Sequence, residues 1–293
     1  MEFLSYLISG ISLGSVYAII ALGYTMVYGI AKMLNFAHGD VIMVGGYISF
    51  CAMSYLGLPN VVAILLAMLV CTILGVVIEG LAYKPLRSAP SLAVLITAIG
   101  VSYFLQNAAQ LIWGSAAKTF TSIVTFKPFS FADGNLVITG EVVITVAASV
   151  LIMIALTFFT GQTRMGKAMR AVSEDRDAAQ LMGINVNQTI SMTFAIGSAL
   201  AAIAGVLLCS TVPTLMPTTG SMPGIRAFTA AVIGGIGSIP GAMLGGILLG
   251  IIETFSKKYI STEFSDAIVF AVLILILLVR PAGLMGKQVQ EKV

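Results

Sequence analysis

The sequence predicts an all-α membrane protein: a polytopic helical bundle of about nine membrane segments in one domain, residues 1–293. Hydrophobic residues make up 58% of the chain and charged residues 9%, whereas a soluble domain carries about 25% charged residues. Segments that cross a bilayer must be helices or closed barrels, because no water is there to pair with backbone groups. The apolar runs are far longer than the roughly 10-residue alternating segments of a barrel, which favours helices.

Stretches containing Gly, Pro or charged residues divide the chain into the expected membrane segments. A helical span needs roughly 20 apolar residues, and the seventh run is too short to cross upright. The runs are 3–30, 41–56, 61–83, 92–113, 142–160, 188–209, 225–237, 242–255 and 267–279. Two polar stretches, 114–140 and 210–224, are expected to be external loops. A third, 161–187, is expected to be a cytoplasmic loop that contains a short helix.

Small residues and one aromatic residue support individual segments. Gly10 and Gly14 lie four residues apart in the first run, and Gly246 and Gly250 repeat this spacing in the eighth. Such spacing lets two membrane helices approach closely. Trp113 closes the fourth run, and tryptophan is enriched where a span meets the interface.

The distribution of Lys and Arg predicts the orientation. With the N-terminus outside, the inner side would hold Lys32, Lys84, Arg87, Arg164, Lys167, Arg170, Arg176, Arg280, Lys287 and Lys292. The outer side would hold Lys118, Lys127, Arg226, Lys257 and Lys258. If residues 225–256 are one re-entrant pair and not two short passes, the preference weakens, and the choice stays open. With nine segments, the last four would be inverted relative to the first four, as in transporters built from inverted repeats.

The polar stretch 161–187 separates two long apolar blocks and predicts a short helix over residues 174–182. Ser173 is a candidate N-cap, Glu174 and Asp175 would occupy the first turn, and Gly183 would end the helix. A helix on the inner membrane face offers a docking site for a soluble motor, and the alternative is a solvated loop. The candidate coupling residues are Ser173, Glu174, Asp175, Arg176, Asp177, Ala178, Ala179 and Leu181.

A second polar stretch, residues 35–40, contains the single histidine of the chain, His38. Ionisable residues inside a membrane usually face a cavity or a partner. The alternative is that Asn35 and Asp40 cap helix ends at the cytoplasmic interface. Glu79 and Glu253 are expected to reach the interface from helix ends. The candidate translocation-path residues are Thr25, Asn35, His38, Asp40, Gln106 and Asn107.

Other chemistries lack the residues they need. The three cysteines lie in apolar runs without metal-ligand spacing, so no metal site is expected. Residues 161–168 match part of a phosphate-binding loop, but Ala168 replaces the hydroxyl that would hold magnesium. No nucleophile–base pair or carboxylate pair supports an enzyme. The net charge of +3 reflects loop bias and gives no reason to expect a nucleic-acid partner.

The chain resembles the permease subunits of ABC importers for branched-chain amino acids, the LivH type, over nearly its whole length. The segments that carry the resemblance are SLGSVYAIIALGYTMVYGI at 12–30, NFAHGD at 35–40, GKAMRAVSEDRDAAQLMGIN at 166–185, AVIGGIGSIPGAMLGGILLGIIE at 231–253 and RPAGLMG at 280–286. The resemblance implies a permease of the vitamin B12 and ribose importer type (type II). It also implies a bacterial inner-membrane location, with the C-terminus and the 161–187 loop in the cytoplasm.

The resemblance further implies partners and a cargo. These are a second, LivM-like permease, two LivG/LivF-like ABC ATPase subunits that bind ATP and Mg, and an external substrate-binding protein. This chain would need no cofactor of its own and would contact membrane lipid. ATP-driven uptake of branched-chain amino acids is the implied function. The alternatives are a related importer for urea, short amides or other amino acids, and a passive small-solute channel.

Overall fold

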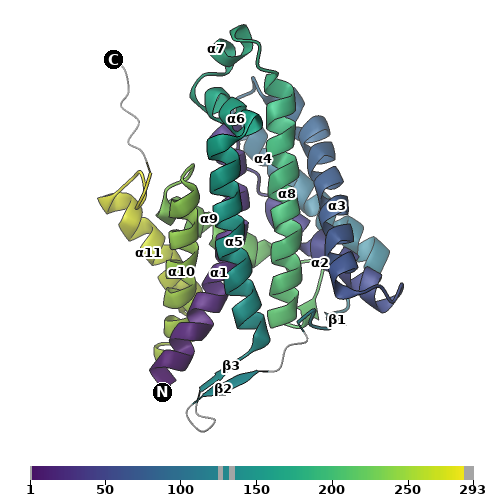
Figure 1. Cartoon of the computed structure of the whole chain (residues 1–293), viewed down its shortest axis with the longest axis vertical. Helices are drawn as coiled ribbons and strands as arrows, with labels where there is room; N and C mark the ends of the chain where they lie inside the picture. The colour runs from purple at the N-terminus through teal and green to yellow at the C-terminus, as the bar shows by residue number, and fades with distance from the viewer. Residues whose placement is uncertain (1, 125–127, 132–135, 287–293) are drawn as a thin grey trace.

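The computed structural model describes residues 2–124, 128–131 and 136–286, and the described chain is mainly helical (Figure 1). Six helical runs are long and apolar enough to cross a membrane. They are α1 (Glu2–Ala31), the run Asn60–Leu86, α4 (Ser91–Trp113), α5 (Gly140–Gln162), α8 (Val186–Thr211) and α10 (Ile239–Tyr259). The second run consists of α3 (Asn60–Ile78), a π-helical turn (Glu79–Tyr83) and a 3₁₀ turn (Lys84–Leu86). The helical bundle is confirmed.

The remaining helices are shorter: α2 (His38–Ser54), α6 (Arg164–Glu174), α7 (Arg176–Leu181), α9 (Ser221–Gly234) and α11 (Ser265–Val279). Because α2, α9 and α11 fall below the length of a full span, the count of nine membrane segments stays a prediction. Three lysines used to predict the orientation, Lys127, Lys287 and Lys292, lie outside the described residues.

Two small antiparallel sheets lie at the end of the bundle where α1 begins, opposite α6 and α7 (Figure 1). Strand β1 (Lys118–Thr119) pairs with β4 (Thr214–Leu215), with Lys118 opposite Leu215. Strand β2 (Phe129–Phe131) pairs with β3 (Leu136–Ile138). The first pair therefore joins the stretches 114–140 and 210–224, both of which the sequence predicts to be external loops.

Helix α1 is the centre of the bundle, and every residue from Gly14 to Val27 is buried. It crosses α10 where glycines remove the side chains. A Cβ atom on Gly10 would lie 2.9 Å from the Cα of Ile251, and one on Gly14 would lie 2.7 Å from the Cα of Ile247. In a membrane, lipid tails are as apolar as the side chains, so the hydrophobic effect does not drive helices together. Van der Waals attraction between closely packed backbones takes its place. The predicted role of the glycine spacing is confirmed.

The two groups of helices on either side of α5 exchange partners in a regular way. Helix α1 packs on α10 as α8 packs on α3, so the first helix of each group contacts the third helix of the other. Likewise, α2 packs on α3 and α8, whereas α9 packs on α10 and α1. The two groups therefore make equivalent contacts, as structural repeats do, and the inversion of one group relative to the other stays a prediction.

Helices α2 and α9 begin inside the bundle, and their first turns meet. A Cβ atom on Gly39 would clash with the backbone of Gly220, and one on Gly224 would lie 2.9 Å from the Cα of Gly39. Residues 32–37, which we call the strap, run without helix from the end of α1 back to the start of α2. Helix α2 thus starts three residues earlier than the expected segment 41–56.

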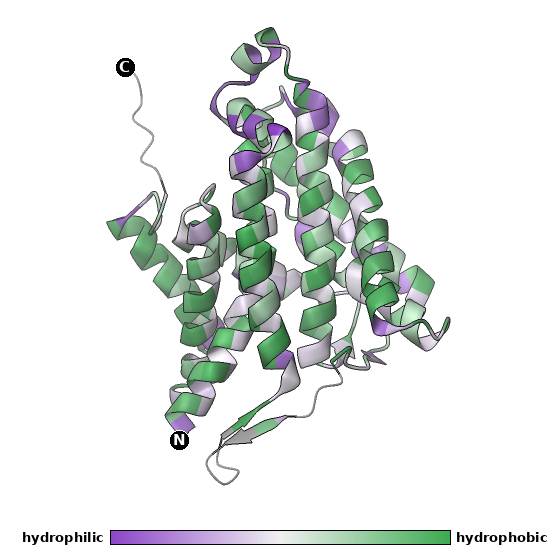
Figure 2. Cartoon of the chain, viewed as in Figure 1, coloured by the Kyte–Doolittle hydropathy of each residue, from purple (hydrophilic) through white to green (hydrophobic). Residues whose placement is uncertain are grey.

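Large apolar side chains cover the outside of the bundle, for example Leu69, Phe104 and Leu151, which are all exposed. Hydrophobic colouring extends along the long helices, and hydrophilic residues gather on α6 and α7 (Figure 2). An apolar exterior of this extent requires lipid around it. The chain is a multi-pass membrane protein.

Candidate functional site

Helices α6 and α7 form the polar end of the molecule. The Thr163 hydroxyl caps α6 by accepting from the Gly166 amide at 3.0 Å. Helix α6 then buries Met169 and Val172 against the bundle. Its opposite face is polar, as expected of a helix that lies across the end of a membrane bundle.

The start of α7 differs from the sequence prediction, which placed a cap at Ser173 and a helix over 174–182. Ser173 lies in the last turn of α6 and donates to the Arg170 carbonyl at 2.7 Å, and Glu174 ends that helix. Asp175 has an extended backbone, and its Oδ1 accepts from the amides of Asp177 and Ala178, each at 2.9 Å. Asp175 is therefore the N-cap, and Glu174 and Asp175 lie outside the first turn of α7. Asp175 caps α7 in place of Ser173 because its carboxylate accepts hydrogen bonds from two backbone amides that have no partner within the helix.

The far end of α7 follows the prediction, because Gly183 has φ +82° and ends the helix. Just before it, Leu181 is 89% exposed and Met182 is 83% exposed. Asp177 and Ala178 are also exposed, whereas Ala179 is buried. These two adjacent apolar side chains form an exposed apolar spot at the polar end of the molecule and are a candidate interaction site.

Arg176 behaves differently from its neighbours. Its guanidinium turns toward the bundle and donates to the carbonyl of Ala31, the last residue of α1. Burial lowers the pKa of Arg176, and the nearby Arg87 guanidinium lowers it further, while Asp177 raises it. The side chain is thus held in a partly dry position by a specific backbone acceptor.

Where α2 and α9 begin, polar side chains from three helices meet. Gln106 of α4 donates its side-chain amide to Asp40 at 2.9 Å, and the same nitrogen lies 3.2 Å from the hydroxyls of Ser102 and Ser221. Asp40 is buried. Asn107 is exposed and donates to the Tyr103 carbonyl of its own helix at 2.7 Å. The structure therefore joins Asp40 and Gln106 and leaves Asn107 apart from them.

The other predicted path residues are buried nearby. The centroid of the His38 ring lies 4.6 Å from that of the Tyr24 ring, and a Cβ atom on Gly23 would lie 2.5 Å from the His38 Nε2. Asn35 accepts from the Tyr83 hydroxyl at 2.9 Å. Within the described residues, the His38 Nε2 and the Thr25 hydroxyl have no hydrogen-bond partner.

The alternative that Asn35 and Asp40 cap helix ends at the interface is wrong. The residue at the N-cap of α2 is Ala37, and no side chain caps that helix. Asp40 instead lies in the first turn, where its negative charge is favoured by the helix dipole. Tertiary contacts with Tyr83 and Gln106 satisfy the two side chains in the interior.

Two buried ionic clusters were not predicted from the sequence. Glu253 of α10 is fully buried and accepts from Tyr17 at 2.8 Å, Arg226 at 2.9 Å and Lys257 at 2.5 Å. Arg226 also binds Asp266 of α11, through its Nε at 2.9 Å and its Nη2 at 2.5 Å. The sequence does contain a sign of this cluster. Arg226 and Glu253 both lie within apolar segments, where charged residues usually pair with each other.

The second cluster is close to α7. Glu79 is buried, forms an ion pair with Arg87 and accepts from the Ser191 hydroxyl at 2.6 Å. Arg87 also donates to Asn187 in the first turn of α8. The expectation that Glu79 and Glu253 reach the interface is therefore wrong, because both side chains are paired inside the protein. Among the described residues, no three His, Cys, Asp or Glu side chains gather as a metal ion would require.

Comparisons with known proteins agree over the whole chain. A family model described as branched-chain amino acid transport system / permease component matches residues 6–277. The high-affinity branched-chain amino acid transport system permease protein BraD of Pseudomonas aeruginosa is 46% identical over 305 residues, covering 100% of this chain and 98% of BraD. The corresponding permease protein LivH of Escherichia coli K12 is 45% identical over 304 residues, with the same coverage.

A more distant relative also matches most of the chain. The probable branched-chain amino acid transport permease protein LivH of Methanocaldococcus jannaschii is 30% identical over 285 residues, which are 92% of this chain and 88% of that protein. These relatives are named as transport permeases and not as enzymes. The chain belongs to the family of permease components of branched-chain amino acid transport systems.

Proposed function

We propose that this chain is the membrane permease subunit of a binding-protein-dependent ABC importer that takes up branched-chain amino acids. The names of its relatives support this cargo over urea, short amides or other amino acids, and over a passive channel. A permease of an ABC importer works with ATPase subunits and a substrate-binding protein. The partners proposed here are a LivM-like second permease, two LivG/LivF-like ATPases that hold ATP and Mg, and an external binding protein. The permease itself binds no cofactor.

The proposed location is the bacterial inner membrane. The N-terminus and the β1–β4 end would face outside, and α6, α7 and the C-terminus would face the cytoplasm. The cluster of basic residues on α6 and α7 supports this orientation. Thr25, Asn35, His38, Asp40, Gln106 and Asn107 remain proposed path residues, of which Asp40 and Gln106 are in contact.

We propose further that the ATPase subunits dock on α7. The observation that carries this docking proposal is the exposed pair Leu181 and Met182 at the tip of a capped helix. An ATPase subunit that receives both side chains in a cleft would gain about 1.5–3 kcal/mol from each. Binding of this strength lets nucleotide-driven movement of the ATPases displace α7. The acidic and polar residues Ser173, Glu174, Asp175 and Asp177 would form the rim of the contact.

The test is a double variant, Leu181→Ser with Met182→Ser, in the complete transporter. At about 1.4 kcal/mol per tenfold change, loss of both contacts weakens ATPase binding about 100-fold or more, so the ATPases no longer co-purify and uptake of radiolabelled leucine stops. The control is Tyr55→Ser with Leu56→Ser, an adjacent pair, each 66% exposed, just after α2. It should retain the ATPases. Normal co-purification and uptake in the first variant would remove the docking proposal.

A further inference from the structure

The end of α1 depends on a residue far away in the sequence. The last carbonyls of a helix have no partner within it, and Ala31 is the last residue of α1. Arg176, the first residue of α7, donates to this carbonyl across 145 positions of sequence. The helix proposed to receive the ATPases is therefore bonded directly to the central helix of the bundle.

The chain reverses direction immediately after this contact. Lys32 has φ +53°, and among the described residues it is the one non-glycine with positive φ. That conformation costs about 1 kcal/mol for a residue with a side chain, so neighbouring contacts must hold it in place. The Arg176 bond is on one side of Lys32, and the bond between Asn35 and Tyr83 is on the other.

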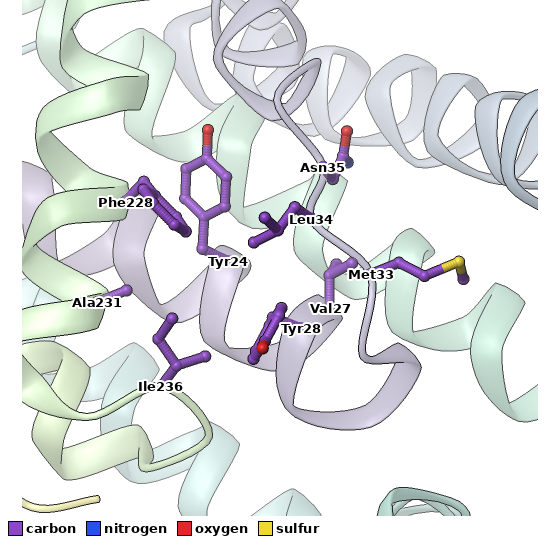
Figure 3. Close-up of a pocket in the computed structure, with 9 residues that line it drawn as sticks. All are labelled: Tyr24, Val27, Tyr28, Met33, Leu34, Asn35, Phe228, Ala231 and Ile236. Atoms are coloured by element: carbon purple, nitrogen blue, oxygen red, sulfur yellow. The ribbon is translucent and has the colours of Figure 1, made fainter. Parts of the chain in front are cut away.

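The strap that begins at Lys32 lines one side of a small cavity (Figure 3). Leu34 points from the strap toward Tyr24 of α1, and Phe228 of α9 lies beside them (Figure 3). The lining of the cavity includes Met33 and Leu34 of the strap, Tyr24 of α1 and Phe228 of α9. Its volume of about 10 Å³ is room for about one water molecule. The strap thus packs between α1 and α9 near the α6–α7 end, and we call this packing the seal.

The surroundings of Arg176 favour its release when α7 moves. Arg87 has two partners of its own, Glu79 and Asn187. Asp177 is near Arg176, but among the described residues no carboxylate forms an ion pair with it. The bond from Arg176 to a neutral carbonyl must offset both partial burial and repulsion from Arg87. A guanidinium held in this way is displaced more easily than one in an ion pair.

We propose that Arg176 is a positioning residue that ties α7 to the end of α1, where the strap begins. Movement of α7 breaks this bond and opens the seal between the strap, α1 and α9. The inference rests on the proposed function, because it takes α7 as the element on which the ATPases act. It gives Arg176 a role distinct from docking. Arg176 faces the bundle and holds the closed position until α7 moves, whereas Leu181 and Met182 face outward and receive the partner.

The test uses Arg176→Ala in the complete transporter, with Arg170→Ala as the matched control. Arg170 is exposed and donates to the backbone carbonyl of Gly161 at 3.0 Å, so it tests loss of a similar bond away from α1. Met33→Cys, in the buried part of the strap, reports opening through reaction with a membrane-impermeant maleimide added at the cytoplasmic face. The same chain without Met33→Cys measures labelling of the native cysteines.

We expect Arg176→Ala to keep its ATPases and to hydrolyse ATP, while leucine uptake falls at least tenfold and labelling at position 33 rises at least tenfold. Arg170→Ala should leave ATPase retention, ATP hydrolysis, leucine uptake and labelling at position 33 unchanged. Arg176→Lys keeps a charged donor and should recover part of the uptake. If Arg176→Ala does not accumulate in membranes, Arg176→Gln, which keeps a neutral donor, is used in the same way.

Two results would overturn the inference: normal uptake, or loss of uptake without faster labelling at position 33. The outcome is separable from that of the proposed function. If the Leu181 and Met182 double variant keeps its ATPases and its uptake, the docking proposal on which this inference rests fails. If that variant loses its ATPases while Arg176→Ala transports normally, only the role of Arg176 fails.

Discussion

Replacing Arg226 with Met should destabilise the protein through the charges it leaves behind. Arg226 connects α9 to Glu253 of α10, Asp266 of α11 and Tyr17 of α1. The Glu253 side chain is 0% exposed and that of Asp266 is 38% exposed. Methionine has a similar length and suits the apolar surroundings. The substitution therefore tests the loss of the charge more than the loss of packing.

The expected magnitude follows from these exposures. Removing one partner of a buried ion pair costs about 3–5 kcal/mol, and the lower end applies because Glu253 keeps its bonds to Lys257 and Tyr17. Glu253→Gln alone should cost about 2 kcal/mol, because Gln keeps a neutral acceptor but leaves Arg226 with one carboxylate. The double variant should cost about 3 kcal/mol in place of the additive 5, a coupling of about 2 kcal/mol.

The assay is reversible unfolding of the four purified proteins in detergent micelles, compared as a double-mutant cycle. Lys257→Met is the control, because the Lys257 side chain is 37% exposed and such a pair contributes about 1 kcal/mol or less. Additive costs for Arg226→Met and Glu253→Gln would show that the two side chains do not stabilise each other. That result would refute the account of this cluster as a coupled buried network.

Two further predictions concern local structure. Gly250→Ala should lower the free energy of unfolding by about 2 kcal/mol or more, because the new Cβ would clash with the backbone of Gly14. Gly100→Ala is the control, because a Cβ atom there would lie in open space on α4; it should be neutral or stabilise the protein by up to about 1 kcal/mol. Equal changes in the free energy of unfolding for the two variants would contradict the close contact between α1 and α10. Asp175→Ala should destabilise α7 by about 1 kcal/mol and speed amide exchange there, whereas Ser173→Ala should not. The reverse order would restore Ser173 as the cap.

The sequence predicts those features of the fold that depend on local composition. Apolar runs place the long helices to within a few residues, and Gly183 correctly marks the end of α7. The close glycine spacing in α1 and α10 correctly indicates a tight crossing, because small side chains permit it wherever the partner lies. These features need no knowledge of which segments meet.

Features that depend on tertiary contacts were predicted less well. Both Ser173 and Asp175 can cap a helix, and the choice depends on how far α6 continues, which burial of Met169 and Val172 determines. The start of α2 at His38 depends on Tyr24, which covers a polar turn that otherwise resembles a loop. Arg176 carries a charge suited to docking, and only the position of Ala31 shows that it faces inward.

The meeting of α2 and α9 through Gly39 and Gly220 bears on how the chain is assembled in the cell. A helix of 17 residues that begins with His38 and Asp40, or one of 14 residues that contains Arg226, is a poor substrate for partitioning into lipid by itself. Each needs the other, together with α1 and α8, to cover its polar first turns. Insertion of this permease is therefore expected to be a late, concerted event in which the first half waits in the translocation machinery until the second half has been synthesised.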